Sequence, residues 1–210
     1  MKYKRSLSAL ALMASLGLSL SACGGSPSAA ATSPNVESLA PSTPSPSASP
    51  EVKKSPRGNI IKALAQPATI TDLTANKPLV TFTVNSIKAN VPCTGPYPDP
   101  VENGHIVVLD VTIQTTPDLA RTDGGYDSFD MNATMFKFVG ANGTTFNGNL
   151  GTQAAYSCLP DEQQIGVNGK GVGPGEKVKG KIAIDVPATK GTLIFKSYLT
   201  SGSSGWEWAF

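Results

Sequence analysis

The sequence predicts an all-β domain, a sandwich of two antiparallel sheets, over residues 57–210. Apolar residues there alternate with polar ones instead of recurring at every third or fourth position. Asn-Gly pairs begin at Asn103, Asn142, Asn147 and Asn168, and such pairs accept the positive φ of tight turns. No amphipathic segment is long enough for a major helix, so the apolar faces of two sheets must cover each other.

The first element, residues 1–22, is predicted to be an export signal. Lys2, Lys4 and Arg5 precede an apolar run of 14 residues, positions 7–20. A charged start followed by a short apolar run is typical of a secretory signal. The run is shorter than the roughly 20 residues that a membrane-spanning helix needs, so a permanent transmembrane anchor is not expected.

The run ends in Leu20-Ser21-Ala22-Cys23-Gly24, which resembles the lipobox of bacterial lipoproteins. In proteins of that type a diacylglyceryl group is joined to the cysteine thiol, and the signal is cut just before it. The resemblance therefore implies a membrane anchor of acyl chains on Cys23, at the extracellular face of the cell membrane. Two acyl chains suffice for stable anchoring, whereas one is marginal.

The second element, residues 23–56, is predicted to be a disordered stalk. Positions 24–56 hold seven Pro and nine Ser, with no aromatic residue, and such a composition cannot bury a core. A chain of this kind spans between about 30 Å as a coil and about 100 Å in polyproline form. It would hold the following domain away from the lipid, and it permits glycosylation without indicating it.

The third element, residues 57–210, contains the predicted strands. Alternation is clear over residues 79–87, 105–113 and 177–186, which is typical of half-buried strands. In the last of these, Ile182, Ile184 and Val186 face inward, whereas Asp185 and the lysines at 177, 179 and 181 face outward. Residues 136–138 and 144–146 flank Asn142-Gly143 and predict a hairpin. Residues 192–199 and 206–210 supply two more strands.

Three long loops are expected at residues 91–102, 117–130 and 148–173. Two of them contain the cysteines of the domain, Cys93 and Cys158. With Cys23 consumed by lipid, this pair is even and lies in an exported chain, so a disulfide is predicted. The crosslink could add as much as roughly 4 kcal/mol in the chain-entropy model.

A second family resemblance rests on turns and core positions. Val172-Gly173-Pro174-Gly175-Glu176 leads into a strand that ends Asp185-Val186-Pro187, after an earlier strand, His105-Ile106-Val107-Val108-Leu109-Asp110-Val111, and a Phe-x-Phe strand with an Asn-Gly turn. Over most of residues 75–199 this resembles a family of secreted, immunoglobulin-like domains of unknown function on Gram-positive lipoproteins, related to a mycobacterial immunoprotective antigen. The resemblance implies an immunoglobulin-like sandwich and an extracellular address, without a mechanism.

Composition and motifs argue against several chemistries. Three of the 17 basic residues precede Cys23, which leaves 14 against 15 acidic residues. A near-neutral chain without blocks of Lys or Arg offers no footprint for nucleic acid. The single histidine, His105, would have to serve any Ser-His-Asp or Cys-His site, and no G-x-S-x-G elbow is present. We therefore expect no catalytic residue, and an edge or capping role for His105.

Two further features have alternative interpretations. Asp118, Asp123, Asp127 and Asp130 lie in one predicted loop, and flexible acidic loops can bind calcium. Their spacing fits no established calcium loop, so a solvated loop without metal is expected, with calcium as the open alternative. Trp206, Trp208 and Phe210 share one face of the last strand, where they either close the core or form an exposed sugar-binding platform. We expect the core, because a terminal strand must be tied down.

The sequence as a whole predicts a non-enzymatic binding module, anchored by lipid and requiring no cofactor. Its loops would bind an envelope protein or a glycan. A hydrolase of the cell envelope and a small-ligand-binding lipoprotein are the alternatives, although the latter usually needs a larger cleft than this chain can build. The oligomeric state is left open.

Overall fold

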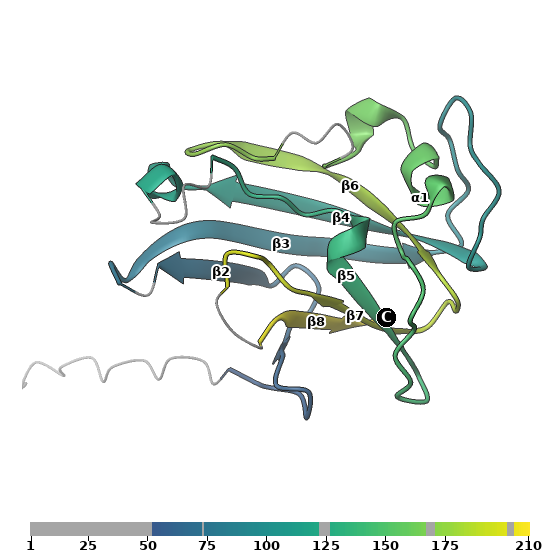
Figure 1. Ribbon diagram of the computed structural model, residues 1–210, viewed down its shortest axis with the longest axis horizontal. Helices are drawn as coiled ribbons and strands as arrows, with labels where there is room; N and C mark the ends of the chain where they lie inside the picture. Colours follow the sequence, from purple (N-terminus) through teal and green to yellow (C-terminus); the bar gives the residue numbers. More distant parts are fainter. Residues whose placement is uncertain (1–51, 73, 122–126, 167–170, 201–203) are drawn as a thin grey trace, which may run out of the picture. The chain divides into compact units, whose positions relative to one another are not determined.

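The computed structural model describes residues 52–210, apart from residues 73, 122–126, 167–170 and 201–203 (Figure 1). The predicted signal, Cys23 and nearly all of the predicted stalk lie outside these residues. Among the residues described, no helix is long and apolar enough to cross a membrane.

Two sheets of four strands form the two layers that Figure 1 shows. One sheet joins β2 (Pro67–Asp72), β3 (Lys77–Ala89), β4 (His105–Thr115) and β6 (Lys177–Val186), all antiparallel. The other joins β1 (Ile60–Ile61), β8 (Trp206–Ala209), β7 (Gly191–Phe195) and β5 (Phe136–Gly140) in that order. The predicted β-sandwich is therefore confirmed, whereas its immunoglobulin-like character stays a prediction.

The observed strands follow the predicted alternation closely, with two differences. β6 has the predicted bounds, and β3 and β4 each extend two residues or more beyond them. β7 ends at Phe195, four residues short of the prediction. The prediction of purely antiparallel sheets is wrong at one place, because β1 pairs with β8 in parallel. A strand of two residues is too short to show a period in the sequence.

The predicted hairpin is present at the outer edge of β5. The Gly140 amide donates to the Thr144 carbonyl, and the Phe146 amide donates to the Phe138 carbonyl, both at 2.9 Å. Gly143 has φ +83°, a conformation that the Asn-Gly pair accepts without strain. The segment after the turn thus occupies the free edge of β5.

The core between the sheets is aromatic. Phe82 on β3 is fully buried, and its ring lies 5.0 Å from Trp206 and 5.4 Å from Phe195, centroid to centroid. Trp206 and Trp208 are 5% and 1% exposed, and Phe210 packs against the same core. The core interpretation of the last strand is confirmed, and the exposed platform is wrong.

The folded part begins N-terminal to the expected boundary at Arg57. The Ile61 amide donates to the Lys53 carbonyl, and the Ser55 amide donates to the Asn59 carbonyl, each at 2.9 Å. These bonds make a small hairpin of residues 53–61, with Ser55 buried. The composition of residues 53–56 predicts that they belong to the stalk, but their backbone pairs with β1 and the residue before it.

The side of this hairpin is held by Glu207 of β8. Arg57 donates to both carboxylate oxygens, from Nη2 at 2.9 Å and from Nε at 3.2 Å, and Asn59 Nδ2 donates at 3.1 Å. Burial opposes ionisation of Glu207, but hydrogen bonds from Arg57, Asn59 and Ser55 and the Arg57 charge outweigh it and lower the pKa of this carboxyl. The N-terminal hairpin and the C-terminal strand are therefore joined by an ion pair between the exposed Arg57 and the buried Glu207.

The long loops contain the short helices. A 3-10 turn at Pro117–Arg121 (η1) follows β4, and another at Ala133–Met135 (η2) leads into β5. The loop predicted at residues 148–173 contains α1 (Gln153–Ser157) and a 3-10 turn at Asp161–Gln163 (η3). This last loop folds back onto the sheet of β4 and β6 and forms the site described next.

Candidate binding site

The outer face of β4 and β6 is covered instead of facing solvent. Ile106 and Val108 of β4 and Ala183 of β6 pack with residues of α1 and the following turn in a second buried cluster, which includes Ala154, Cys158 and Leu159. We call residues 91–104 and 152–163 together the cover. Because of the cover, β4 and β6 are buried on both faces at the end of the sandwich where β4 begins.

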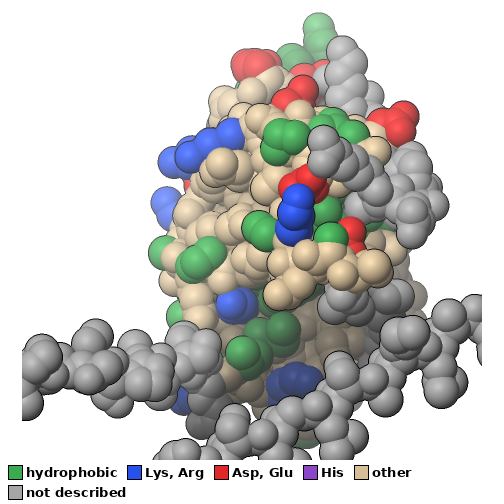
Figure 2. Space-filling model, turned by 90° about the vertical axis from the view of Figure 1, so that its left-hand side faces the viewer, with side chains coloured by type: hydrophobic (Ala, Val, Ile, Leu, Met, Phe, Trp, Pro, Cys, Tyr) green, Lys and Arg blue, Asp and Glu red, His purple; other side chains and the backbone are tan. Residues whose placement is uncertain are grey.

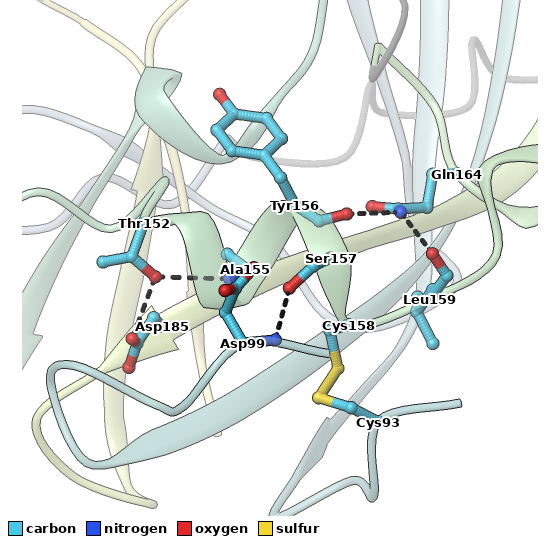
Figure 3. The surroundings of a disulfide bond; sticks show 10 residues. All are labelled: Cys93, Asp99, Thr152, Ala155, Tyr156, Ser157, Cys158, Leu159, Gln164 and Asp185. Atoms are coloured by element: carbon cyan, nitrogen blue, oxygen red, sulfur yellow. Dashed lines mark hydrogen bonds between the residues drawn. A yellow bond between two sulfur atoms is a disulfide. The ribbon is translucent and has the colours of Figure 1, made fainter. Parts of the chain in front are cut away.

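The two parts of the cover are joined by the predicted disulfide. Cys93 and Cys158 are bonded, with Cα atoms 4.4 Å apart and a separation of 65 positions in sequence. The Thr94 and Gly95 amides donate to the Cys158 carbonyl at 2.7 and 2.9 Å. The Asp99 amide donates to Ser157 Oγ at 2.8 Å (Figure 3). The Gln153 amide also donates to Glu102 Oε1, at 3.3 Å. The disulfide is thus one of five bonds that fix loop 91–104 to α1 and its C-terminal end.

Gly95 shows how closely these parts approach. A Cβ atom built at this position would lie 2.1 Å from the Ser157 carbonyl oxygen. Any other residue would push the loop away from α1, because the atom in contact belongs to the backbone. The close approach accounts for glycine at this position.

Asp185 lies beneath the cover and bonds to both of its parts. Its side chain was predicted to face outward into solvent, but the residue is fully buried, because the cover closes over that face of β6. The carboxylate accepts from the Glu102 amide at 2.8 Å, the Asn103 amide at 3.2 Å and Thr152 Oγ1 at 2.9 Å. Figure 3 shows Thr152 between Asp185 and the start of α1, where it also accepts from the Ala155 amide. These donors satisfy a buried carboxylate, which gives Asp185 a structural role.

Loop 91–104 presents an aromatic residue to solvent. Tyr97 is 87% exposed, although proline stands at positions 92, 96, 98 and 100 and the disulfide lies four residues away. Proline fixes φ at each of these positions, so the loop loses little conformational freedom when it binds a partner. Tyr97 is not among the residues predicted from the sequence; its place between prolines, in a loop with a paired cysteine, is the signal that points to it.

The cover is acidic. Asp99, Glu102, Asp161 and Glu162 are all exposed, and neither part of the cover contains lysine or arginine. The face of the molecule in Figure 2, by contrast, carries both acidic and basic side chains, the acidic ones mostly in its upper part. The acidic cover is therefore a local feature of a chain that is close to neutral.

Of the remaining predicted sites, His105 adjoins the cover and lines a hollow together with residues of loop 91–104. It is the first residue of β4, an inner strand, and its Nδ1 lies 2.9 Å from Asn90 Oδ1. Asp118 pairs with Lys77 at 3.7 Å, and Asp123 lies outside the described residues. In the part of the chain that is described, no three His, Cys, Asp or Glu side chains gather closely enough to hold a metal ion.

The class of protein that this geometry defines is a β-sandwich with a disulfide-fixed cover on one sheet. No family model matches the chain, and no curated protein sequence matches it. A solved structure that is similar is the secreted protein MPT63 of Mycobacterium tuberculosis, at 18% identity and a TM-score of 0.43. The match covers 72% of this chain and 98% of that one.

Proposed function

We propose that this chain is a lipid-anchored protein of the extracellular face of the cell membrane, and that it binds a protein partner of the envelope through the cover. Tyr97 would be the central contact. The proposal needs no catalytic group and no cofactor.

The address is supported by the first residues and by the disulfide. The signal and the sequence around Cys23 are of the lipoprotein type. Structural disulfides form and persist in oxidising compartments outside the cytosol, and Cys93–Cys158 is such a bond. Both features favour an exported, anchored chain.

Binding through the cover is supported above all by the exposure of Tyr97 on a fixed loop. Interface hot spots are enriched in Tyr, Trp and Arg, and a loop that is rigid before binding loses less entropy in the complex. The four carboxylates of the cover would favour a partner with a basic surface around an apolar pocket, because complementary charge guides association.

The test compares variants of Tyr97 on intact cells. Chemical crosslinking with mass spectrometry identifies the partner that wild-type chain contacts, and its affinity is then measured with purified proteins. Tyr97→Ala should weaken binding about thirtyfold, the effect of a hot spot of about 2 kcal/mol. Tyr97→Phe keeps the ring and should retain most of the affinity.

Tyr198→Ala is the matched control, because this tyrosine is also exposed, at 41%, but lies outside the cover. It should leave the affinity unchanged. Equal binding by wild type and Tyr97→Ala would refute the proposal. So would carboxyl-directed crosslinks that reach the partner without involving Asp99 or Glu102, since loop 91–104 contains no lysine.

A further inference from the structure

A hollow lies beside the cover, at the same end of the sandwich. It has a volume of about 820 Å³ and lies between the turn after β5, residues 141–148, and the turn from β6 to β7, residues 187–190. Asn103 of the cover reaches this region, since its Nδ2 donates to the Asn149 carbonyl at 2.7 Å. The volume is within the range of small-molecule sites, about 300–1,000 Å³.

The floor of the hollow is apolar and includes an aromatic ring. Phe146 packs against the core from the turn after β5 and is half-buried. The ring approaches the backbone of Gly148 closely, because a Cβ atom at this position would lie 2.3 Å from it. Pro187 and Ala188 complete the floor from the opposite turn. The hollow thus offers an aromatic ring edged by small apolar groups.

The rim carries side chains with unused hydrogen-bonding capacity. Asn142 Oδ1 accepts from the Thr144 amide at 3.0 Å, so the Asn142 amide nitrogen is the end left for a ligand. The side chains of Thr145, Asn147 and Thr189 make no hydrogen bond within the residues described. Among the described residues that line the hollow there is no carboxylate, and Lys190 is the one charged residue.

These features argue against three classes of ligand. An extended peptide cannot add to β5, because its outer edge is already bonded to residues 144–146. A phosphate group would need several cations or a cradle of amides, and one lysine is not enough. A wholly apolar ligand would bury the rim amides and hydroxyls without partners, which is unfavourable.

We propose that the hollow binds a sugar ring of an envelope glycan. The apolar face of the ring would lie on Phe146, and its hydroxyls would bond to Asn142, Asn147 and Thr189. A neutral, polyhydroxylated ring has an apolar face that matches the floor of the hollow. Its hydroxyl groups match the amides and hydroxyls of the rim. The site uses none of the residues proposed to contact a protein partner, so it stands independently of that function.

The test is a titration of the chain from Gly24 onward, labelled for amide NMR. The probes are the trisaccharides of N-acetylglucosamine, mannose and galactose, each up to about 10 mM, which detects dissociation constants near 1 mM. At least one trisaccharide should shift the amides of residues 140–148 and 188–191. Phe146→Tyr keeps the ring and should retain binding.

Two variants locate the site. Phe146→Ala should weaken binding at least about tenfold through loss of the ring. Phe146 also packs on the core, so its removal changes the fold's packing as well as the site. The second variant, Asn147→Ala with Thr189→Ala, therefore changes only rim positions that are exposed or half-buried. It should weaken binding about tenfold, as expected for one or two lost hydrogen bonds. Tyr97→Ala should bind the sugar as wild type does, which separates this proposal from the protein-binding one.

The proposal is overturned if no trisaccharide shifts these amides, or if the shifts survive both variants. It is also overturned if a peptide of residues 26–50 shifts them and the sugars do not, because the occupant would then be the chain's own stalk segment.

Discussion

Glu207 is ionised in the folded protein although its side chain is only 6% exposed. Hydrogen bonds from Arg57 and Asn59 compensate for the loss of water, and they stabilise the charged form against the neutral one. A carboxyl with a lowered pKa stabilises the fold above its unfolded-state pKa, and this contribution is lost as the pH falls through the folded-state pKa.

Glu207→Gln should therefore lower the free energy of unfolding at pH 7 by about 1–3 kcal/mol, the range for a lost bond to a charged group. The difference in unfolding free energy between this variant and the wild type should shrink as the pH falls below 4.5, the ordinary pKa of a glutamate. It should vanish once the folded-state carboxyl is protonated. Urea denaturation at pH 7, 5 and 3 measures it. Glu162→Gln, at an exposed position, should show almost no difference at any pH; a pH-independent difference for Glu207→Gln would contradict the argument.

The cover is an element whose attachment depends on one covalent bond and a few hydrogen bonds. In the double variant Cys93→Ala, Cys158→Ala, the free energy of unfolding should fall by up to about 4 kcal/mol. Hydrogen exchange should accelerate first at the amides of Thr94 and Asp99, because the cover can open without the sandwich. Amides in the middle of β3 and β4 should exchange only by global unfolding. If all of these amides accelerate equally, the cover is not a separate unit.

The last strand, β8, is an element held by its aromatic side chains. Trp208 is 1% exposed, and its Nε1 has no hydrogen-bond partner among the described residues. Trp208→Ala should cost about 3–5 kcal/mol, as large aromatic deletions do, whereas Trp208→Phe should cost much less because it also removes an unsatisfied N–H. Thermal melts and iodide quenching measure both effects. Tyr97→Ala, the removal of an exposed ring, should leave the melting temperature nearly unchanged.

Sequence patterns predicted the strands that have one face in the core, and they predicted less where both faces are buried. Ile106 and Val108 are apolar at the outward positions of β4, which is the signal of a strand covered on both sides. The alternation over residues 105–113 predicted only one buried face for this strand. Asp185 gave no such signal, because an aspartate at an outward position looks solvated until the segment that covers it is known.

β2 was missed for a different reason. Ala68 and Ile70 alternate with threonine, but the strand is short and opens with Pro67, which is tolerated at the first residue of an edge strand. The disulfide was predictable, since two cysteines in an exported domain leave one pairing. The hollow beside β5 could not be predicted, because it arises where two turns far apart in sequence meet.

For the whole molecule, the decisive prediction concerns the anchor. Cys23→Ala should abolish incorporation of labelled palmitate, and it should release the protein from the membrane fraction or leave its signal uncut. The physical reason is that the apolar run alone is too short to hold the chain in the bilayer. Cys93→Ala leaves Cys23 in place and serves as the control. Labelling that persists in Cys23→Ala would end the proposal of a lipid anchor.

The hairpin of residues 53–61 sets how the molecule responds to tension. A chain tethered ahead of Val52 and held at its far end by a partner transmits the load first to the bonds between Lys53 and Ile61 and between Ser55 and Asn59. The pull separates the two arms of the hairpin from their open end, so these bonds break one after another. Release of residues 52–66, which also breaks the pairing of β1 with β8 and the bonds from Arg57 and Asn59 to Glu207, would yield roughly 50 Å of extended chain while the disulfide-braced sandwich stays intact. Single-molecule pulling should record a short first extension well before the main unfolding event, and a trace with one event only would exclude this yielding segment.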